Sequence, residues 1–226
     1  MSSSLSLPFS TEQFYGVFGR YNQAVWPAQV LLLAMALACI AAVSFMPALA
    51  RGIPSVLAAL WAWMGVAYHF AFFSVINPAA WAFGAMCLVA AAAFVWEGAR
   101  GRLLFHWVPG WRAAAGAALI AYALVGYPVL GTLLGSAYPR SPTFGLPCPT
   151  TIFTLGILLF AVRPVPRFVF VVPLLWSAIG SFAAFSLGVG QDVGLLVAAA
   201  IVVPALVSNT PSKGEVSCRT PPLSQH

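Results

Sequence analysis

Charged residues are so widely spaced in this chain that long apolar intervals separate them. The uncharged intervals cover residues 21–50, 52–96, 113–139, 141–162, 168–191 and 193–212. Only 6% of the 226 residues are charged and 62% are hydrophobic, whereas soluble domains carry about 25% charged residues. Because so few charges cannot cover an apolar core with a water-facing shell, the pattern indicates a protein that folds inside a lipid bilayer.

The length of each interval predicts how many helices it holds. A helix needs about 20 residues to cross the hydrocarbon core, so the interval 52–96 holds two helices, separated near Asn77, and each other interval holds one. The segment after Cys148 is short, and it fits either a tilted helix or a re-entrant segment buried in protein. We predict an all-α, polytopic bundle of seven transmembrane helices, at about 27–46, 54–75, 78–96, 113–134, 149–162, 168–187 and 192–207.

The basic residues predict the orientation of this bundle. With seven spans, eight Lys and Arg residues fall on one side, and only Arg20 and Arg140 fall on the other. The positive-inside rule then places the N-terminus outside the cell and the C-terminus in the cytoplasm, with the protein in the inner cell membrane. We expect residues 1–207 to form one membrane-embedded domain and the polar tail 208–226 to be disordered. No cleaved signal peptide is expected, because a basic segment followed by an apolar run is missing at the start.

A short amphipathic helix is predicted before the first span, at about 10–25. Ser10 and Gln13 fit a capping box, and Phe9 and Phe14 are placed as the hydrophobic staple around it. Apolar residues then recur at helical spacing opposite a polar face. The helix fits two environments equally well, the outer membrane interface or the surface of the bundle as a lid.

The predicted topology gathers most polar side chains on the outer side. His69 is the only Asp, Glu, Lys, Arg or His well inside a span, and Asp192 stands at the outer start of the last span. Ionisable residues inside a membrane are functional candidates by default. However, His69 also fits a structural, hydrogen-bonded imidazole, and Asp192 also fits a helix cap. The candidate residues for a ligand or ion are His69, Asn77, Tyr138, Arg140, Cys148, Thr150, Thr151, Gln191 and Asp192.

Two kinds of bound ion follow from these residues as further hypotheses. Proline follows Trp26, Asn77 and Cys148 at three outer helix starts, a position that suits proline, and the positive ends of such helices can hold an anion. Any bundle of this topology points those ends outward, however. Cys148 and His69 are weak candidates for a soft or borderline metal, since a specific site normally needs three or four ligands.

Several function classes are excluded. The basic residues are scattered, without the clustered stripe that nucleic-acid binding requires. A phosphate-binding loop, a dinucleotide fingerprint and a zinc-protease motif are all missing from the sequence, and whether the protein uses a cofactor stays unknown from the sequence. The only lysine, Lys213, lies in the tail, which excludes a retinal Schiff base inside the bundle.

The outer motifs resemble those of a family of bacterial multi-pass membrane proteins known only as a domain of unknown function. They occupy residues 9–14, 21–27, 68–80, 127–154 and 190–195, and the Pro-Cys-Pro-Thr-Thr stretch at 147–151 is the most specific of them. The resemblance covers nearly the whole chain up to about residue 207. It implies a fold and a membrane location, and it supplies no activity.

Three functions remain open from the sequence. The first is binding or passage of a small solute or ion through a polar site open to the non-cytoplasmic side, with a homo-oligomer compensating for the small size. The second is an intramembrane enzyme that uses His69, Asp192 or Cys148, although no catalytic pair stands at diagnostic spacing. The third is a structural, sensor or assembly subunit that docks through the N-terminal helix or the basic segment 100–112.

Overall fold

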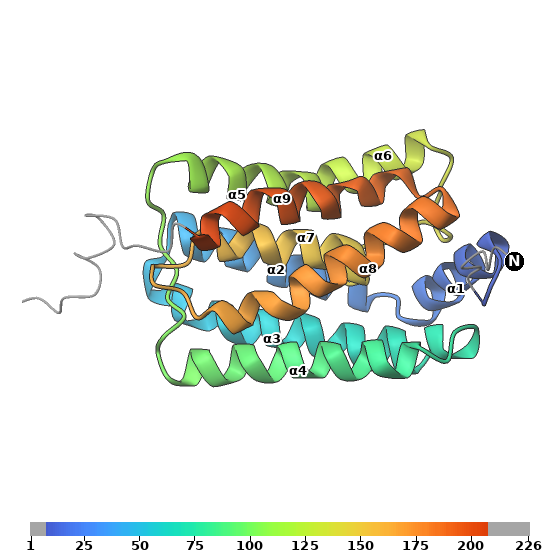
Figure 1. The fold of residues 1–226 in the computed structure, drawn as a ribbon, viewed down its shortest axis with the longest axis horizontal. Helices are drawn as coiled ribbons and strands as arrows, with labels where there is room; N and C mark the ends of the chain where they lie inside the picture. The colour runs from blue at the N-terminus through green and yellow to red at the C-terminus, as the bar shows by residue number, and fades with distance from the viewer. Residues whose placement is uncertain (1–7, 208–226) are drawn as a thin grey trace, which may run out of the picture.

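Helices account for the regular structure of the chain in a computed structural model that describes residues 8–207 (Figure 1). Within that range there is no strand, and the predicted tail 208–226 lies outside it. The α-helices are α1 (Thr11–Ala24), α2 (Ala28–Ser44), α3 (Ile53–Trp63), α4 (Ala80–Ala99), α5 (Trp111–Ala121), α6 (Tyr127–Leu133), α7 (Pro147–Leu158), α8 (Val171–Leu187) and α9 (Val193–Val207). In the same range, four short 3₁₀-helices and two π-helical segments extend or connect them. The 3₁₀-helices are η1 (Pro47–Gly52), η3 (Phe73–Val75), η5 (Arg167–Phe170) and η6 (Gly190–Asp192), and the π-helical segments are η2 (Met64–Phe70) and η4 (Tyr122–Gly126).

The helices agree with the predicted spans, and most are long enough to cross a membrane. Each of the seven expected segments overlaps a helix. Five continuous helices are long and apolar enough to cross, and α1 with α2 qualifies as a sixth, although the two are bent by 88°. The five are Pro47–Val75, Ala80–Ala99, Trp111–Leu133, Arg167–Leu187 and Gly190–Val207. The all-helical prediction is confirmed, whereas seven crossings and their orientation stay predictions.

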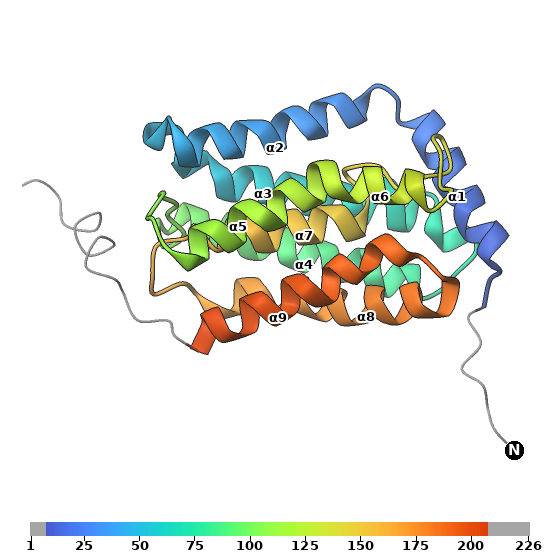
Figure 2. The same cartoon turned by 90° about the horizontal axis from the view of Figure 1, so that it is seen from above.

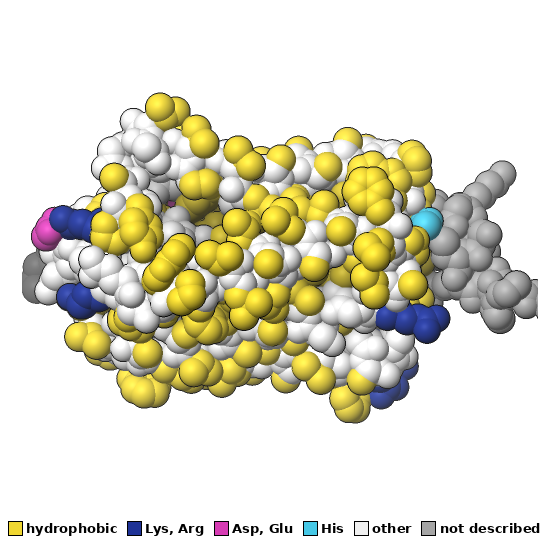
Figure 3. All heavy atoms as spheres, turned by 180° about the vertical axis from the view of Figure 1, so that it is seen from behind, with side chains coloured by type: hydrophobic (Ala, Val, Ile, Leu, Met, Phe, Trp, Pro, Cys, Tyr) yellow, Lys and Arg dark blue, Asp and Glu magenta, His cyan; other side chains and the backbone are white. Residues whose placement is uncertain are grey.

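Apolar side chains cover the outside of the bundle as well as its core. Only 33% to 50% of the residues in the five apolar windows are buried inside the protein. Figure 3 shows hydrophobic side chains over the body of the molecule, with charged side chains gathered at its two ends. A surface of this kind is compatible with a membrane protein, because lipid is the solvent that such a surface prefers.

The short helix α7 lies in the centre of the bundle, between its neighbours (Figure 2). All of its residues from Pro149 to Leu158 are buried, which explains its all-round apolar sequence. It begins at the end that carries α1, and the chain after it pairs with the α4–α5 connection at the opposite end, where the Val162 N–H donates to the Leu104 carbonyl at 2.8 Å. The segment therefore runs the length of the bundle as a short helix followed by extended chain.

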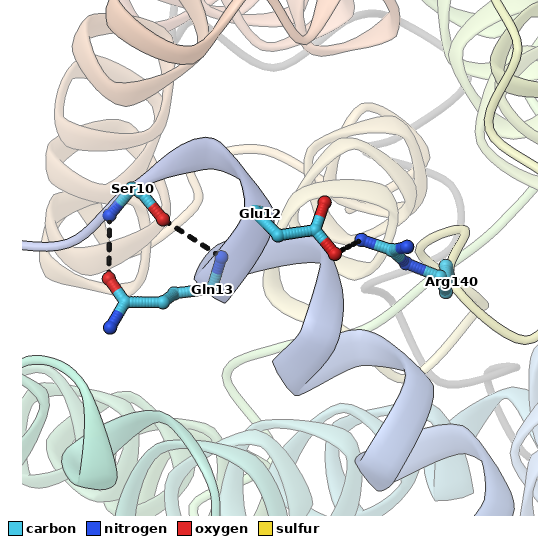
Figure 4. A network of polar contacts seen from close by, with 4 residues as sticks. All are labelled: Ser10, Glu12, Gln13 and Arg140. Atoms are coloured by element: carbon cyan, nitrogen blue, oxygen red, sulfur yellow. Dashed lines mark hydrogen bonds and ion pairs between the residues drawn. The ribbon is translucent and has the colours of Figure 1, made fainter.

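Helix α1 lies across one end of the bundle (Figures 1 and 2). The predicted capping box is confirmed, since the Gln13 N–H donates to Ser10 Oγ at 3.2 Å and the Ser10 N–H donates to Gln13 Oε1 at 2.8 Å (Figure 4). The apolar face of α1 packs on the bundle, because Val17, Phe18 and Tyr21 are buried by protein. Helix α1 therefore forms a lid on the bundle, and its contact with the membrane interface stays a prediction.

Candidate functional site

A cavity of about 400 Å³ lies beneath α1, between the ends of α4, α7 and α8. Its walls are mostly aromatic and apolar, and among the described residues that line it none is Lys, Arg or His. Asp192 is the one carboxylate in the lining. The aromatic side chains that contribute to the walls are Phe9, Phe14, Phe18, Tyr68, Phe73, Phe83, Trp176 and Phe182.

Asp192 lies at the floor of this cavity and is held by side chains from two other helices. The Tyr127 hydroxyl donates a hydrogen bond to Asp192 Oδ1. The Cys148 thiol is also within hydrogen-bonding reach of Asp192. Asp192 is only 4% exposed, so these contacts compensate part of the cost of removing a carboxyl group from water. The floor of the cavity therefore presents one carboxyl group whose hydrogen-bond donors are supplied by the protein itself.

Local sequence signals bring these three side chains together. Helix α8 ends at Gly188, whose left-handed backbone (φ 70°) stops the helix, as glycine commonly does at this position. The turn that follows carries Asp192 to the start of α9. Pro147 opens α7, where its missing N–H costs nothing, and this puts Cys148 in the first turn of that helix. The starts of α7 and α9 thus both face the floor of the cavity.

Asn22 fastens α1 over the cavity. Its side-chain amide donates to the carbonyl oxygens of Pro139 at 2.6 Å and Ser141 at 2.8 Å. Its Oδ1 accepts from the Thr143 hydroxyl at 2.7 Å, and the whole residue is buried. One side chain of α1 therefore satisfies three polar groups of the loop that leads to α7.

Two further contacts hold α1. Trp63 Nε1 donates to the Tyr21 hydroxyl at 2.7 Å, and burial raises the pKa of this phenol to about 12, although the Trp63 hydrogen bond lowers it. Tyr21 therefore stays protonated at neutral pH. Arg140 pairs with Glu12 at 2.7 Å (Figure 4). The side chains of this pair are 48% and 80% exposed, so it contributes only about 0–1 kcal/mol.

His69 lies behind the cavity wall rather than in its lining. Its ring is fully buried, and neither nitrogen has a hydrogen-bond partner among residues 8–207. The imidazole instead contacts aromatic rings edge to face, with centroids 5.1 Å from Trp176, 5.8 Å from Phe83 and 5.9 Å from Phe73. Within the described range the hydrogen bond expected for a structural imidazole is missing, and His69 supports four rings of the wall by packing, because it also contacts Tyr68 at 5.1 Å.

Truncating His69 is expected to destabilise the protein through lost packing. We expect His69→Ala to lower the free energy of unfolding by about 3 kcal/mol, because it leaves a void among the aromatic rings. His69→Phe should retain most of the stability, since a ring remains in place. Thermal melting in mild detergent measures both variants. A His69→Phe variant as unstable as His69→Ala would show that the ring nitrogens matter, and it would contradict this prediction.

The structure brings three of the candidate residues from the sequence to the cavity, namely Asn77, Cys148 and Asp192. Asn77 also accepts a hydrogen bond from the Ala79 N–H at 3.0 Å at the start of α4. Tyr138 is exposed outside the cavity, and Arg140 makes the surface ion pair described above.

The other candidates are buried away from the cavity lining. Thr150 Oγ1 accepts from the Gly145 N–H at 3.1 Å and so shapes the start of α7. Thr151 is fully buried in α7. The carbonyl of Gln191 accepts from the Tyr122 hydroxyl at 2.6 Å. These residues shape and support the elements around the cavity.

Metal binding gains no support from this arrangement. Across residues 8–207, no group of three or more His, Cys, Asp or Glu side chains lies close enough to hold a metal ion. Cys148 has Asp192 beside it, whereas His69 has no polar partner in the same range.

Tyr127 and Trp176 are parts of the site that the sequence did not single out. Tyr127 is fully buried in α6 and bonded to Asp192. The Nε1 group of Trp176 is buried near the Cys148 thiol, and it makes no hydrogen bond of normal geometry within residues 8–207. An aromatic residue inside an apolar span carries no sequence signal that distinguishes such a role from ordinary packing.

Comparison with known proteins gives a family. Residues 11–215 match the model of a family of unknown function, DUF6064. No curated protein and no solved structure matches the chain. The family match confirms the resemblance inferred from the outer motifs.

Proposed function

The chain belongs to DUF6064, a family of unknown function, and we propose that it is a seven-helix membrane protein that binds a small molecule in the cavity beneath α1. The observation that carries this proposal is the cavity itself. Its volume of about 400 Å³ falls within the range of about 300–1,000 Å³ that is common for ligand pockets. Its largely apolar walls and few convergent polar groups are also what such pockets share.

The proposed topology has seven crossings, with α1 outside and the C-terminus in the cytoplasm. Two observations support it. The segment 147–162 runs from one end of the bundle to the other, so α7 counts as a crossing. The basic residues of the described chain also lie mostly at one end, as the positive-inside rule requires. Arg51, Arg100, Arg102, Arg112, Arg163 and Arg167 belong to that end, and Arg20 and Arg140 to the other.

The exposed tryptophans agree with two membrane interfaces. Trp26 and Trp81 lie near the α1 end of the helices, and Trp96, Trp107 and Trp111 lie near the opposite end. Tryptophan is enriched where a membrane meets water. The cavity then lies near the non-cytoplasmic interface, where a solute from that side reaches it.

Cysteine labelling in intact cells tests the orientation. We expect a cysteine introduced at Ser141 to react with a membrane-impermeant maleimide from outside, and one introduced at Gly101 to react only after the membrane is opened. The test uses a chain whose own cysteines are replaced. If both positions react from the same side, the proposed orientation is wrong, and the proposal that solutes enter the cavity from the non-cytoplasmic side fails with it.

Filling the cavity should abolish ligand binding while leaving the fold intact. Ala183 lines the cavity, and Ala183→Phe adds a ring to that space. Ala178 lies on the outward side of the same helix and is exposed, so Ala178→Phe is the matched control. Native mass spectrometry with a panel of small amines and alcohols should detect a bound molecule in the wild type and in Ala178→Phe, but not in Ala183→Phe. Equal binding by both variants would show that the ligand does not occupy the cavity.

An enzymatic role is less well supported by the same residues. His69 and Asp192 do not form a pair, since His69 has no hydrogen-bond partner in the described chain. Cys148 and Asp192 do meet. However, a thiolate there would lie beside a carboxylate between apolar walls, and none of the described lining residues is the cationic partner that activates a nucleophilic cysteine. The geometry therefore favours binding over nucleophilic catalysis.

A further inference from the structure

We propose that the cavity beneath α1 accepts a small organic cation, an alkylammonium or arylammonium group, whose charge lies between the aromatic walls and Asp192. This inference rests on the proposed function and names the class of molecule that the same site takes. Its basis is the combination of many aromatic rings, one carboxylate and no basic side chain among the described lining residues.

The aromatic rings of the walls form two groups. Phe73 is the centre of one group, with ring centroids 5.4 Å from Phe9 and 5.6 Å from Tyr68. Phe83 and Trp176 form another side, with centroids 5.5 Å apart. The faces of such rings carry partial negative charge and attract quaternary and alkylated ammonium groups, which is the basis of aromatic cages. Several rings around one cavity therefore suit a cation that gives up its water molecules easily when it binds.

Asp192 supplies the charge that selects a cation over a neutral molecule. Tyr127 and Cys148 point hydrogen-bond donors at this carboxyl group, and these contacts offset part of the cost of burying its charge between apolar walls. The carboxyl group also lies at the start of α9 and beside the first turn of α7, where the positive ends of helix dipoles stabilise a negative charge. Because the Asp192 carboxyl group already lies at these helix ends, they have no room for the bound anion that the sequence suggested.

The walls favour an organic cation over a metal ion. Calcium requires about six to eight oxygen ligands and magnesium keeps an octahedral shell, but oxygen ligands are scarce among the described residues that line the cavity. Phenyl and indole rings cannot replace the hydration shell of a small, hard ion. An alkylated ammonium group is weakly hydrated and large enough to contact several rings at once, so it suits both features of the site.

Choline and its neutral isostere, 3,3-dimethylbutan-1-ol, test the inference. The two molecules have nearly the same shape, and a carbon replaces the charged nitrogen in the alcohol. We expect calorimetric titration of the full chain in lipid nanodiscs to show choline bound about tenfold more tightly, or more, than the alcohol. Asp192→Asn should remove this preference while the alcohol still binds. Glu12→Gln, which changes an exposed carboxylate at the same end, should leave the preference unchanged.

The outcomes separate this inference from the proposed function. Equal affinities for choline and the alcohol in the wild type would overturn the cation inference and leave a small-molecule site. Choline binding that Ala183→Phe leaves unchanged would place the ligand elsewhere, and both proposals would fail. Binding of neither molecule would overturn the cation inference, whereas the proposed function would still be decided by the wider panel.

A second variant covers the case in which Asp192→Asn does not fold. Trp176→Leu keeps the carboxylate and removes one aromatic face from the wall. We expect it to weaken choline severalfold more than the alcohol, because only the cation gains from the ring face. An equal loss of affinity for both molecules would show that Trp176 contributes shape alone, and it would count against the cage.

Discussion

Replacing Gly156 with valine is expected to lower the free energy of unfolding by about 3 kcal/mol or more, because α7 is surrounded by other helices and cannot shift to make room for the larger side chain. A Cβ atom at Gly156 would lie 3.0 Å from the Gly116 carbonyl oxygen of α5 and 3.0 Å from Ile120 Cγ1. Both helices are tightly placed, and α7 is surrounded by protein. We expect Gly156→Val to lose the monodisperse peak in size-exclusion chromatography in mild detergent, and to lower the melting temperature sharply.

Gly16 provides the matched control for this substitution. It lies within α1, and a Cβ atom there would meet nothing within 4 Å. Gly16→Val should therefore leave the melting temperature close to that of the wild type. Wild-type behaviour of Gly156→Val would mean that the close approach of α5 and α7 contributes little, and the central position of α7 would need another explanation.

Charge spacing and proline predicted most of the helices because both act locally. The uncharged intervals located each of the seven expected segments. Asn77 and the proline after it marked the break between the second and third of these segments, just before the start of α4. The ends were less accurate, since α4 continues past Glu97 to Ala99. Glu97 was used as a boundary, yet its side chain is fully buried. A single charge marks the end of an apolar stretch without specifying which way its side chain points.

The arrangement around Asp192 could not be predicted, because its partners are far away in the sequence. Tyr127 lies 65 residues before Asp192, and only the packing of α6 beside η6 brings them together. The polar asymmetry did point to the end of the bundle at which the cavity lies. It could not separate Cys148, which lines the cavity, from Thr150, which holds the backbone at the start of the same helix. That difference depends on the rotation of α7 about its axis.

The lid and the floor of the cavity are stabilised in different ways. The floor consists of helix starts that pack inside the bundle, so its geometry is tied to the fold as a whole. The lid, α1, is connected through the polar contacts of Asn22, through the single hydrogen bond from Trp63 to Tyr21 and through the aromatic rings that it places on the cavity. Since the exposed Glu12–Arg140 pair adds little, Asn22 is the residue on which closure of the cavity should depend most.

Asn22→Leu is therefore expected to release α1 and to open the cavity. The substitution leaves the partly buried carbonyl groups of Pro139 and Ser141 and the hydroxyl of Thr143 without their partner. An unsatisfied buried polar group costs about 1–3 kcal/mol, so we expect a total loss of about 3 kcal/mol in thermal melting. Once α1 moves away, Cys148 beneath it becomes accessible, and a polar maleimide should label it at least severalfold faster in nanodiscs.

Gln23→Leu is the matched control, since Gln23 is the next residue of α1 and its side chain is exposed. The labelling uses a Cys218→Ser background, so that the remaining cysteines are Cys148 and the buried Cys39 and Cys87. We expect Gln23→Leu to match the parent chain in both melting and labelling. If Asn22→Leu melts at a lower temperature but labels Cys148 no faster, then Asn22 stabilises the loop before α7 without holding the lid. If neither quantity changes, α1 is held by the contacts that this substitution leaves in place, chiefly its aromatic packing and the hydrogen bond from Trp63 to Tyr21.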